Sequence, residues 1–407
     1  MTESGARVAV VVLGDLGRSP RMLYHAVALA EAGARVDLVG YEETDLAPAV
    51  SENPAIRVHA LRAPARDVPR ALFVAHGLLR VVRQAGELFR VLRRVRADTI
   101  LVQTPPAIPT LLVALVAARA SGARFVVDWH NFGWAMLGLR LPARHPVVRL
   151  ARAWERLLGP RADAHLCVSH AMAAELARNW RIQAVVLHDR PAERFIPAPP
   201  ETRAAIRVRL AAEWGISGSL ALVVAPTGWT ADEDVDLLVD AAVELDAAIA
   251  TEPAMPDVVI VATGRGPLRE AWERRVATLS LRRVRLCARW LPAAEYPGFL
   301  AAADVGISVH RSASGLDLPM KVADLLGAGV PVCALAYAPC LAEMIRDGET
   351  GLLFTTGEEL ATRLRTLLGE DRDGDRLLAR LRRNVATAEG ERWGDAWHRA
   401  ARPVLLP

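Results

Sequence analysis

Lysine is almost absent from this chain of 407 residues, in which a single lysine, Lys321, stands beside 49 arginines. The two residue types are not equivalent. Lysine places a compact, flexible ammonium on a phosphate, whereas the planar guanidinium of arginine makes forked contacts. The one lysine is therefore either a chance survivor of an arginine-rich composition or a position that requires an ammonium, and its neighbours decide between the two.

Cysteine and long apolar runs are also scarce. The four cysteines have no CxxC spacing, so the sequence predicts no metal site and indicates buried thiols in a reducing compartment: Cys167, Cys287, Cys333 and Cys340. The longest apolar stretches, residues 71–82 and 108–119, are shorter than the ~20 residues of a membrane span. The opening MTESGARVAVVV runs from polar residues into a strand, which disfavours a signal peptide.

The net charge of +4 is unevenly distributed. Residues 60–96 carry nine arginines against two acids, and residues 140–161 carry six against one. Such local excess favours an anionic partner, which is a membrane surface, a diphosphate or a nucleic acid. Nucleic acid is the least favoured of the three, because the aromatic residues are not interleaved with the basic ones.

The length predicts two domains, and both show short apolar strands alternating with amphipathic helices. We expect an α/β fold of two doubly wound, Rossmann-like domains that face each other across a cleft. The predicted divisions are an N-terminal domain at 1–190, a Pro-rich linker at 191–215, a C-terminal domain at 216–387, and a last helix at about 388–407 that packs back onto the first domain. Ligands of such sheets bind beyond the carboxyl ends of the strands.

Two segments after strands of the first half carry candidate chemistry. In GDLGRSPR, Gly14 and Gly17 allow tight turns before a helix N-terminus, a weak anion signal that is equally typical of an ordinary turn. In VVDWHNFGW, Asp128, His130 and Asn131 follow a buried strand, flanked by Trp129 and Trp134. Carboxylates and imidazoles handle hydroxyl protons and aromatic faces pack on sugars, so this segment predicts a sugar site with a general base. The alternative is a hydrogen-bonded turn with a core histidine.

Three segments of the second half are candidates for nucleotide contacts. In PTGWTADEDVD, Thr230 and Glu233 match a capping box, which predicts a helix start, while Gly228 and Trp229 would line the cleft. In TGRGPL, Gly264 and Arg265 suit a phosphate or nucleoside contact, although such loops are common. In HRSASGLDLPMKVAD, a small-residue loop after His310 precedes a helix that carries Lys321 and Asp324, a pattern that predicts a nucleotide-diphosphate site.

These stretches, together with QTPPAIPT and HLCVSHAM, occur in the same order in one family. From about residue 7 to its end, the chain resembles the chitobiosyl-diphosphodolichol β-mannosyltransferases, which have the two-domain GT-B fold. The resemblance implies a GDP-mannose donor, inversion to a β-1,4 linkage, and an acceptor GlcNAc on a lipid diphosphate. It implies no metal and no cofactor. The composition looks bacterial, which indicates a polyprenyl carrier other than dolichol.

The resemblance also assigns roles to residues. Asp324 matches the acid that binds the donor ribose, and Lys321 with the loop Ser314, Gly315, Leu316 and Asp317 matches the diphosphate region. Leu316 stands where retaining relatives have a glutamate, which agrees with inversion. Further donor contacts are expected from Gly228, Trp229, Gly264, Arg265 and His310, and acceptor contacts from Gly17, Arg18, Asn131 and Trp134. The expected base is Asp128 or His130, with Asp15 as the third choice.

Eukaryotic members of that family begin with a membrane span, and we expect none in this sequence. Residues 68–96, rich in arginine, leucine and valine, are either a peripheral membrane contact or a helix with a solvated basic face. The enzyme is expected in the cytoplasm, on the cytoplasmic face of the inner membrane. Three alternatives stay open: a GT-B glycosyltransferase with another donor or glycan, a sugar-nucleotide epimerase, and a non-catalytic nucleotide-binding protein.

Overall fold

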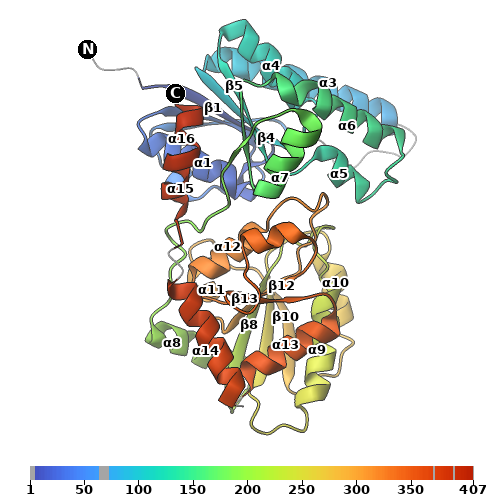
Figure 1. Cartoon of the computed structure of the whole chain (residues 1–407), viewed down its shortest axis with the longest axis vertical. Helices are drawn as coiled ribbons and strands as arrows, with labels where there is room; N and C mark the ends of the chain where they lie inside the picture. The colour runs from blue at the N-terminus through green and yellow to red at the C-terminus, as the bar shows by residue number, and fades with distance from the viewer. Residues whose placement is uncertain (1–4, 64–72, 370–371, 388–389, 407) are drawn as a thin grey trace. The chain divides into compact units, whose positions relative to one another are not determined.

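The computed structural model describes residues 5–63, 73–369, 372–387 and 390–406. The chain divides into two compact units, the first formed by Met1–His188 with Trp393–Pro407 and the second by Asp189–Arg392 (Figure 1). The expected linker at 191–215 lies in the second unit, where much of it is helix α8 (Pro200–Trp214). The last residues of the chain, Trp393–Pro407, belong to the first unit.

The first unit is built on a seven-stranded parallel sheet with the order β3-β2-β1-β4-β5-β6-β7. Its strands are β1 (Arg7–Asp15), β2 (Arg35–Tyr41), β3 (Ile56–Ala60), β4 (Thr99–Thr104), β5 (Arg124–Trp129), β6 (Ala164–Cys167) and β7 (Val185–Val186). The central strands are buried along most of their length because helices cover both faces of a doubly wound sheet. Strand order reverses between β1 and β4, which marks the carboxyl ends of these strands as the place for a ligand.

Helices flank both faces of this sheet. They are η1 (Leu16–Arg18), α1 (Pro20–Glu31), α2 (Pro48–Ser51), α3 (Phe73–Val95), α4 (Thr110–Ser121), α5 (Gly133–Gly138), α6 (Pro146–Leu158), η3 (Gly159–Arg161), α7 (His170–Glu175), η4 (Leu176–Trp180), α15 (Trp393–Ala400) and α16 (Arg402–Leu405). Figure 1 shows α3, α4 and α6 together on one side and α1, α15 and α16 on the other. The apolar faces of α1, α15 and α16 share one core with the sheet, so the C-terminal segment completes this unit.

The second unit contains a six-stranded parallel sheet with the order β10-β9-β8-β11-β12-β13. Its strands are β8 (Leu220–Pro226), β9 (Asp257–Thr263), β10 (Val284–Arg289), β11 (Val305–Ser308), β12 (Val332–Leu335) and β13 (Gly351–Phe354). Besides α8, its helices are α9 (Asp236–Ile249), α10 (Arg269–Val276), α11 (Tyr296–Ala301), α12 (Met320–Gly327), η5 (Pro339–Glu343), α13 (Gly357–Leu368) and α14 (Arg372–Thr387). Strand order reverses between β8 and β11, so the loops after these two strands lie at the switch point.

The prediction of two doubly wound parallel sheets is confirmed. Strands β3 and β13 could not be predicted from the sequence, because IRVHA and GLLF are short and carry no long apolar run. Three of the four cysteines are buried, Cys287 is half-buried, and all four are free thiols. Within the described ranges, no helix is long and apolar enough to cross a membrane.

Candidate active site

Asp128 lies at the carboxyl end of β5 and is completely buried. Its carboxylate receives a forked pair of hydrogen bonds from Arg21 on α1: Nε donates to Oδ2 at 2.8 Å and Nη2 to Oδ1 at 3.0 Å. Arg21 also donates to the carbonyl oxygen of Leu187 at 2.8 Å, and its guanidinium lies 5.4 Å from the ring centroid of Trp393. A buried carboxylate with a forked arginine partner keeps its charge, because the paired donors replace the lost hydration.

His25, one turn after Arg21 on α1, is the second partner of this carboxylate. Its Nε2 lies 3.2 Å from Asp128 Oδ2, and its Nδ1 accepts a hydrogen bond from the indole N–H of Trp397 at 3.0 Å. The proton of the neutral ring therefore sits on Nε2 and points at Asp128. Burial lowers the pKa of His25 more than Asp128 raises it, so the ring is neutral at physiological pH. Trp393 and Trp397 thus connect the C-terminal helix α15 to the cluster.

His130 is the third partner and the one with access to solvent. Its Nε2 lies 2.9 Å from Asp128 Oδ2, and its side chain is 20% exposed. Burial alone would raise the pKa of Asp128, but Arg21, His130 and His25 outweigh it and hold that pKa well below its usual range. An ionised carboxylate only accepts, so Nε2 of His130 carries a proton, and in the neutral ring the lone pair lies on Nδ1. That Nδ1 has no hydrogen-bond partner among the residues that the structure describes.

A second buried carboxylate supports the loop that follows β5. Glu155 on α6 is completely buried, and its Oε1 accepts a hydrogen bond from the backbone N–H of Gly133 at 2.7 Å, at the start of α5. Its Oε2 has no hydrogen-bond partner in the described part of the chain. Burial raises the pKa of Glu155 to about 7, because no cation offsets the loss of hydration. A Cβ at Gly133 would lie 2.8 Å from Glu155 Oε1, so a larger residue there would displace this carboxylate.

The other predicted residues of the first unit occupy varied places. Asp15 is turned toward Thr44, accepting from its backbone N–H at 3.1 Å and from its hydroxyl at 2.5 Å, which makes it a loop anchor. Gly17 lies against this loop, where a Cβ would be 2.7 Å from the Thr44 carbonyl oxygen, and Arg18 is exposed. Asn131 is buried, and its side chain accepts from the next backbone N–H at 2.8 Å.

The two tryptophans beside this motif differ. The ring of Trp129 is buried against Phe132 and Trp180, so the expectation that it packs on a sugar is wrong. Trp134 is partly exposed, stacks on Phe132 at 6.0 Å, and lies 5.0 Å from the guanidinium of Arg152. Of the pair, only Trp134 offers ring surface to an acceptor.

In the second unit, Lys321 on α12 is paired with the buried Glu233. Glu233 also accepts from the backbone N–H of Gly228 at 2.7 Å, and a Cβ at Gly228 would lie 3.6 Å from the Lys321 ammonium nitrogen. Burial alone would raise the pKa of Glu233, but Lys321 outweighs it and lowers that pKa. The capping-box prediction is wrong, because α9 begins at Asp236 and Glu233 instead joins the loop after β8 to α12.

The loops after β8 and β9 touch backbone to backbone. A Cβ at Gly264 would lie 2.0 Å from the carbonyl oxygen of Thr227, so only glycine fits there, and its φ is +104°. Arg265 lies over Trp290, 3.9 Å from the ring centroid. Trp229 is fully buried in the core against Trp272, so the prediction of a donor contact through its ring is wrong. A buried indole packs well, and this one anchors the loop that holds Gly228.

The small-residue loop after β11 folds around Asp317. His310 Nε2 lies 3.0 Å from its carboxylate, and the hydroxyls of Ser312 and Ser314 donate to it. The backbone N–H groups of Gly315 and Leu316 donate to Ser312 Oγ at 2.8 and 3.3 Å. These N–H groups therefore organise the loop, and the expected cradle of free N–H donors for a diphosphate is not formed in this conformation.

Asp324 lies one turn into α12 and is partly exposed. Its carboxylate makes no hydrogen bond to another described residue. Burial raises the pKa of Asp324 to about 7, with Arg194 and Lys321 opposing the rise and Asp189 adding to it. An acid of this kind is ready to exchange a proton or to accept hydroxyl donors near neutral pH.

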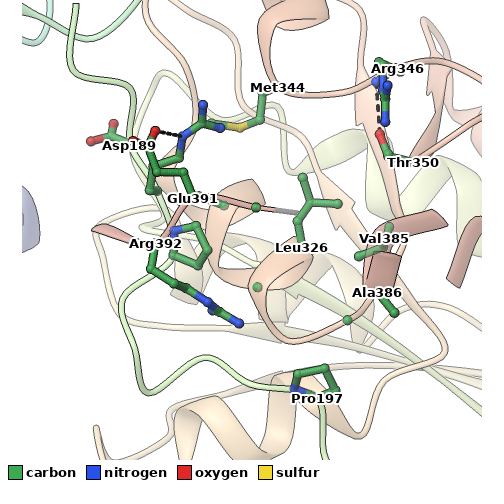
Figure 2. Close-up of a pocket in the computed structure, with 16 residues that line it drawn as sticks. Asp189, Pro197, Leu326, Met344, Arg346, Thr350, Val385, Ala386, Glu391 and Arg392 are labelled. Carbon is green, nitrogen blue, oxygen red and sulfur yellow. Dashed lines mark hydrogen bonds and ion pairs between the residues drawn. The ribbon is translucent and has the colours of Figure 1, made fainter. Parts of the chain in front are cut away.

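A cavity of about 300 Å³ in the second unit lies behind the end of α12 (Figure 2). It is lined by Asp189, Arg190, Pro191, Pro197, Ala323, Leu326, Gly327, Gly329, Met344, Arg346, Thr350, Val385, Ala386, Gly390, Glu391 and Arg392. None of the residues predicted for the donor lines it. Gly327 and Gly329 are in close contact with Pro191 and Pro197, so the segment after residue 188 packs directly on the helix that carries Lys321 and Asp324.

Sequence reasoning found Asp128, His130, Lys321 and Asp324 but missed their partners Arg21, His25, Glu155, Glu233 and Trp397. A signal existed for two of them. Arg21 and His25 are four residues apart in PRMLYHAVALAE, on a helix that is otherwise nearly all apolar, which indicates buried polar side chains with a common partner.

The comparisons with known proteins agree with this architecture. Residues 16–192 match the family model described as glycosyl transferase 4-like domain, and residues 220–370 match glycosyl transferases group 1. The solved structure of WaaG, a glycosyltransferase involved in lipopolysaccharide biosynthesis, superposes with a TM-score of 0.71 at 16% identity, covering 98% of this chain and 99% of that one. Anabaena HepE in complex with UDP-glucose gives 0.69 at 16% identity and the same coverage. The protein is thus a glycosyltransferase of the GT-B fold.

Sequence relatives define the family more narrowly. The mouse chitobiosyldiphosphodolichol beta-mannosyltransferase is 35% identical over 437 residues, covering 99% of this chain and 90% of the mouse protein. The human protein of that name is 33% identical, with 98% and 92% covered. The Arabidopsis thaliana protein named UDP-glycosyltransferase TURAN is 37% identical, with 98% and 97% covered. This chain belongs to the chitobiosyldiphosphodolichol beta-mannosyltransferase family.

Proposed function

We propose that this enzyme transfers mannose from GDP-mannose to a GlcNAc-terminated glycan on a polyprenyl diphosphate, forming a β-1,4 linkage with inversion. The observation that carries the proposal is the Asp128–His130 pair at the end of β5, in a chain whose mannosyltransferase relatives match almost its full length. An inverting transfer needs one base to take the acceptor proton, and this pair supplies it.

His130 is the base, and Asp128 is its positioning residue. Asp128 is buried and saturated by donors, and its pKa lies well below the usual range, so it is a poor proton acceptor. It fixes the tautomer of His130, as carboxylates do for catalytic histidines elsewhere. The acceptor hydroxyl oxygen attacks C1 of mannose while its proton passes to Nδ1 of His130. The bond from C1 to the diphosphate oxygen breaks on the opposite face, and GDP leaves. Asp15 is not the base, because its carboxylate is held by Thr44.

The second unit holds the donor. The Lys321 ammonium is placed by Glu233 beside Gly228, where it neutralises charge on the departing diphosphate. Asp324 accepts hydrogen bonds from the ribose hydroxyls, and Gly264, Arg265 and His310 line the same ends of the strands. The resemblance to GT-B enzymes that use basic side chains in this way supports a reaction without a metal or a cofactor. The loop at 312–317 rearranges if its N–H groups take the diphosphate.

The acceptor lies with the first unit, where Trp134 and Asn131 follow the catalytic motif. The enzyme works on the cytoplasmic face of the membrane that holds the acceptor lipid, attached peripherally. Part of the segment assigned to that attachment, residues 68–96, is helix α3, while 68–72 lie outside the described residues.

One observation favours a UDP-sugar as the donor. The Arabidopsis relative carries the name UDP-glycosyltransferase TURAN. Lys321 and the loops around it would accept either nucleotide, because they contact the diphosphate and not the base or the sugar. A UDP-sugar donor is therefore the competing hypothesis.

The test is a donor screen with product analysis. The purified chain is incubated with a short-chain lipid-diphosphate chitobiose and, separately, with GDP-mannose, UDP-glucose and UDP-N-acetylglucosamine. We expect transfer from GDP-mannose alone and a β-linked mannose by NMR. Transfer from a UDP-sugar, or an α-linked product, would overturn the proposal. Consumption of a donor without any acceptor would identify an epimerase or a hydrolase instead.

A further inference from the structure

The outward face of α6 carries an apolar row beside a basic row. Leu150 is 61% exposed and Leu157 is 56% exposed, and seven residues of spacing place them above one another on the helix. Arg149 and Arg156 have the same spacing and form a parallel row next to them, both exposed. The inward face is different in character, since Val148, Ala151, Glu155 and Leu158 are all buried. This is the pattern of a helix that lies in a membrane interface.

The neighbouring helices α4 and α3 also carry exposed apolar side chains. Helix α4 contacts both α3 and α6, and Figure 1 shows the three together on one side of the sheet. On α4, Leu112 and Val116 are exposed, and on α3, Leu79 and Val82 are exposed, Val82 by 59%. Exposed arginines accompany them: Arg80, Arg83, Arg90, Arg93, Arg94 and Arg119. We call α3, α4 and α6 with these side chains the three-helix face.

Negative charge is nearly missing from the three-helix face. Within the three helices the sequence has only Glu87 and Glu155, and Glu155 is buried beneath α6. Single exposed apolar residues are common on proteins and need no explanation. Seven large ones on three adjacent helices, interspersed with an excess of arginines, are not: Leu79, Val82, Leu112, Val116, Val147, Leu150 and Leu157. A partner that covers this surface would have to be both apolar and acidic. An anionic bilayer combines an apolar interior with negatively charged headgroups.

We propose that the three-helix face docks on an anionic phospholipid bilayer, with α6 seated in the interface and α3 and α4 beside it. This docking rests on the peripheral attachment in the proposed function, which named only residues 68–96. The binding of the three-helix face to lipid does not depend on which sugar donor the enzyme uses. The leucine rows enter the boundary between headgroups and acyl chains, and the arginines contact lipid phosphates. Docking brings α6, whose inner side holds the loop after β5 through Glu155, next to the membrane that contains a lipid-linked acceptor.

The experiment is vesicle flotation with the full chain. Vesicles of phosphatidylcholine with 30 mol% phosphatidylglycerol are compared with vesicles of phosphatidylcholine alone, at low and high salt. Three variants are made: Leu150→Ser with Leu157→Ser, Arg83→Gln with Arg149→Gln, and a matched control, Val208→Ser with Arg209→Gln. The control changes an exposed valine, 70% accessible, and an exposed arginine on α8 of the second unit. Thermal unfolding of each variant checks the fold.

We expect the wild type and the α8 control to float with the anionic vesicles and to be released by salt. Each arginine removed should weaken binding about fivefold. The leucine variant should lose most of its binding to either composition, because apolar insertion is then lost. Turnover on a water-soluble acceptor should be unchanged in all variants.

Several results would overturn the proposal. These are no flotation of the wild type, equal flotation of all variants, or loss confined to the α8 control. A dimer that disappears in the leucine variant, without vesicle binding, would identify a second copy of the chain as the occupant. Failure of the proposed function is seen separately, as no transfer to the soluble acceptor by a chain that still floats.

Discussion

Two carboxylates, Asp128 at the carboxyl end of β5 and Asp324 on α12, have pKa values shifted in opposite directions. Asp128 is buried with Arg21, His25 and His130 around it, and its pKa is far below the usual range. Asp324 has cations nearby but no hydrogen-bond donor among the described residues, and its pKa is raised to about 7. Hydration is lost completely at Asp128 and in part at Asp324, and the hydrogen-bond donors decide which carboxylate keeps its charge. The first unit thus holds a preassembled charged cluster, and the second unit holds an acid poised to titrate.

Glu155 adds a third case, because it shares a unit with Asp128 and behaves like Asp324. Its donors are the backbone N–H groups of Gly133 and Trp134, with no cation beside them, and its pKa is also about 7. Backbone N–H groups alone therefore do not keep a buried carboxylate ionised here. The guanidinium of Arg21 makes the difference, and breaking its pair with Asp128 should have the largest consequence.

The largest effect is expected from Asp128→Asn. The substitution leaves the guanidinium of Arg21 buried without a counter-charge, which should lower the free energy of unfolding by about 3–5 kcal/mol at pH 7. Urea unfolding followed by circular dichroism measures it. Asp234→Asn is the matched control, because its pair with Arg311 at 3.0 Å is exposed and should contribute less than about 1 kcal/mol. Equal effects of the two substitutions would mean that the buried cluster contributes no more to the free energy of unfolding than an exposed ion pair.

Glu155→Gln should change how stability depends on pH. The pKa of Glu155 rises from 4.5 unfolded to about 7 folded, so the folded state binds more protons between these values and stability falls as pH rises through them. The variant removes this penalty, which amounts to about 3 kcal/mol above pH 8. Unfolding should show a more stable variant at pH 8 and no gain at pH 4.5. A gain that is independent of pH would contradict the assignment.

Lys321→Ala should weaken donor binding, but it would also leave Glu233 buried and unpaired. The clean comparison is therefore Lys321→Ala with Glu233→Gln against Glu233→Gln alone. We expect the affinity for GDP-mannose, measured by calorimetry, to fall about 10- to 100-fold, as for a lost charged hydrogen bond. Lys321→Arg tests the role of the ammonium itself. Unchanged affinity in the double variant would return the single lysine to chance.

The smallest effect is expected from Asp324→Asn. If its carboxylate accepts ribose hydroxyls, its protonation below a pKa of about 7 should weaken GDP-mannose binding by the wild type between pH 8 and pH 6. The loss should reach about tenfold at pH 6, and the variant should bind weakly at both values. Calorimetry at the two pH values measures it. A wild type with the same affinity at both would place the ribose elsewhere.

Local patterns in the sequence predicted the parts of this site that lie on one segment. Asp128 and His130 follow an apolar run, RFVVDW, and polar residues after a buried strand point to a site at the sheet's carboxyl edge. Lys321 and Asp324 follow a strand and a small-residue loop in the second unit, and this pattern likewise predicted a site at the carboxyl edge of the sheet. The alternation of strands and helices predicted the fold, whereas the short strands β3 and β13 were not predictable from it.

Local sequence patterns could not predict the contacts between segments that are distant in the chain. Trp397 reaches His25 across 372 positions, and Arg21 reaches Asp128 across 107, so no local pattern reports either. Glu233 fitted a capping box as well as it fitted a lysine partner, and tertiary packing chose the second. Trp229 looked like a ligand contact because it follows a strand, yet its indole packs in the core, since nothing in the spacing says which way a loop side chain turns.

In the proposed function, the first unit moves the proton and the second unit holds the donor. His130→Gln tests it most directly, with kcat and the affinity for GDP-mannose measured on the same preparation. We predict that kcat falls about 10²- to 10⁴-fold, as expected for loss of a general base, while the affinity stays within about twofold of the wild type. A collapse of donor affinity, or an unchanged kcat, would contradict the account.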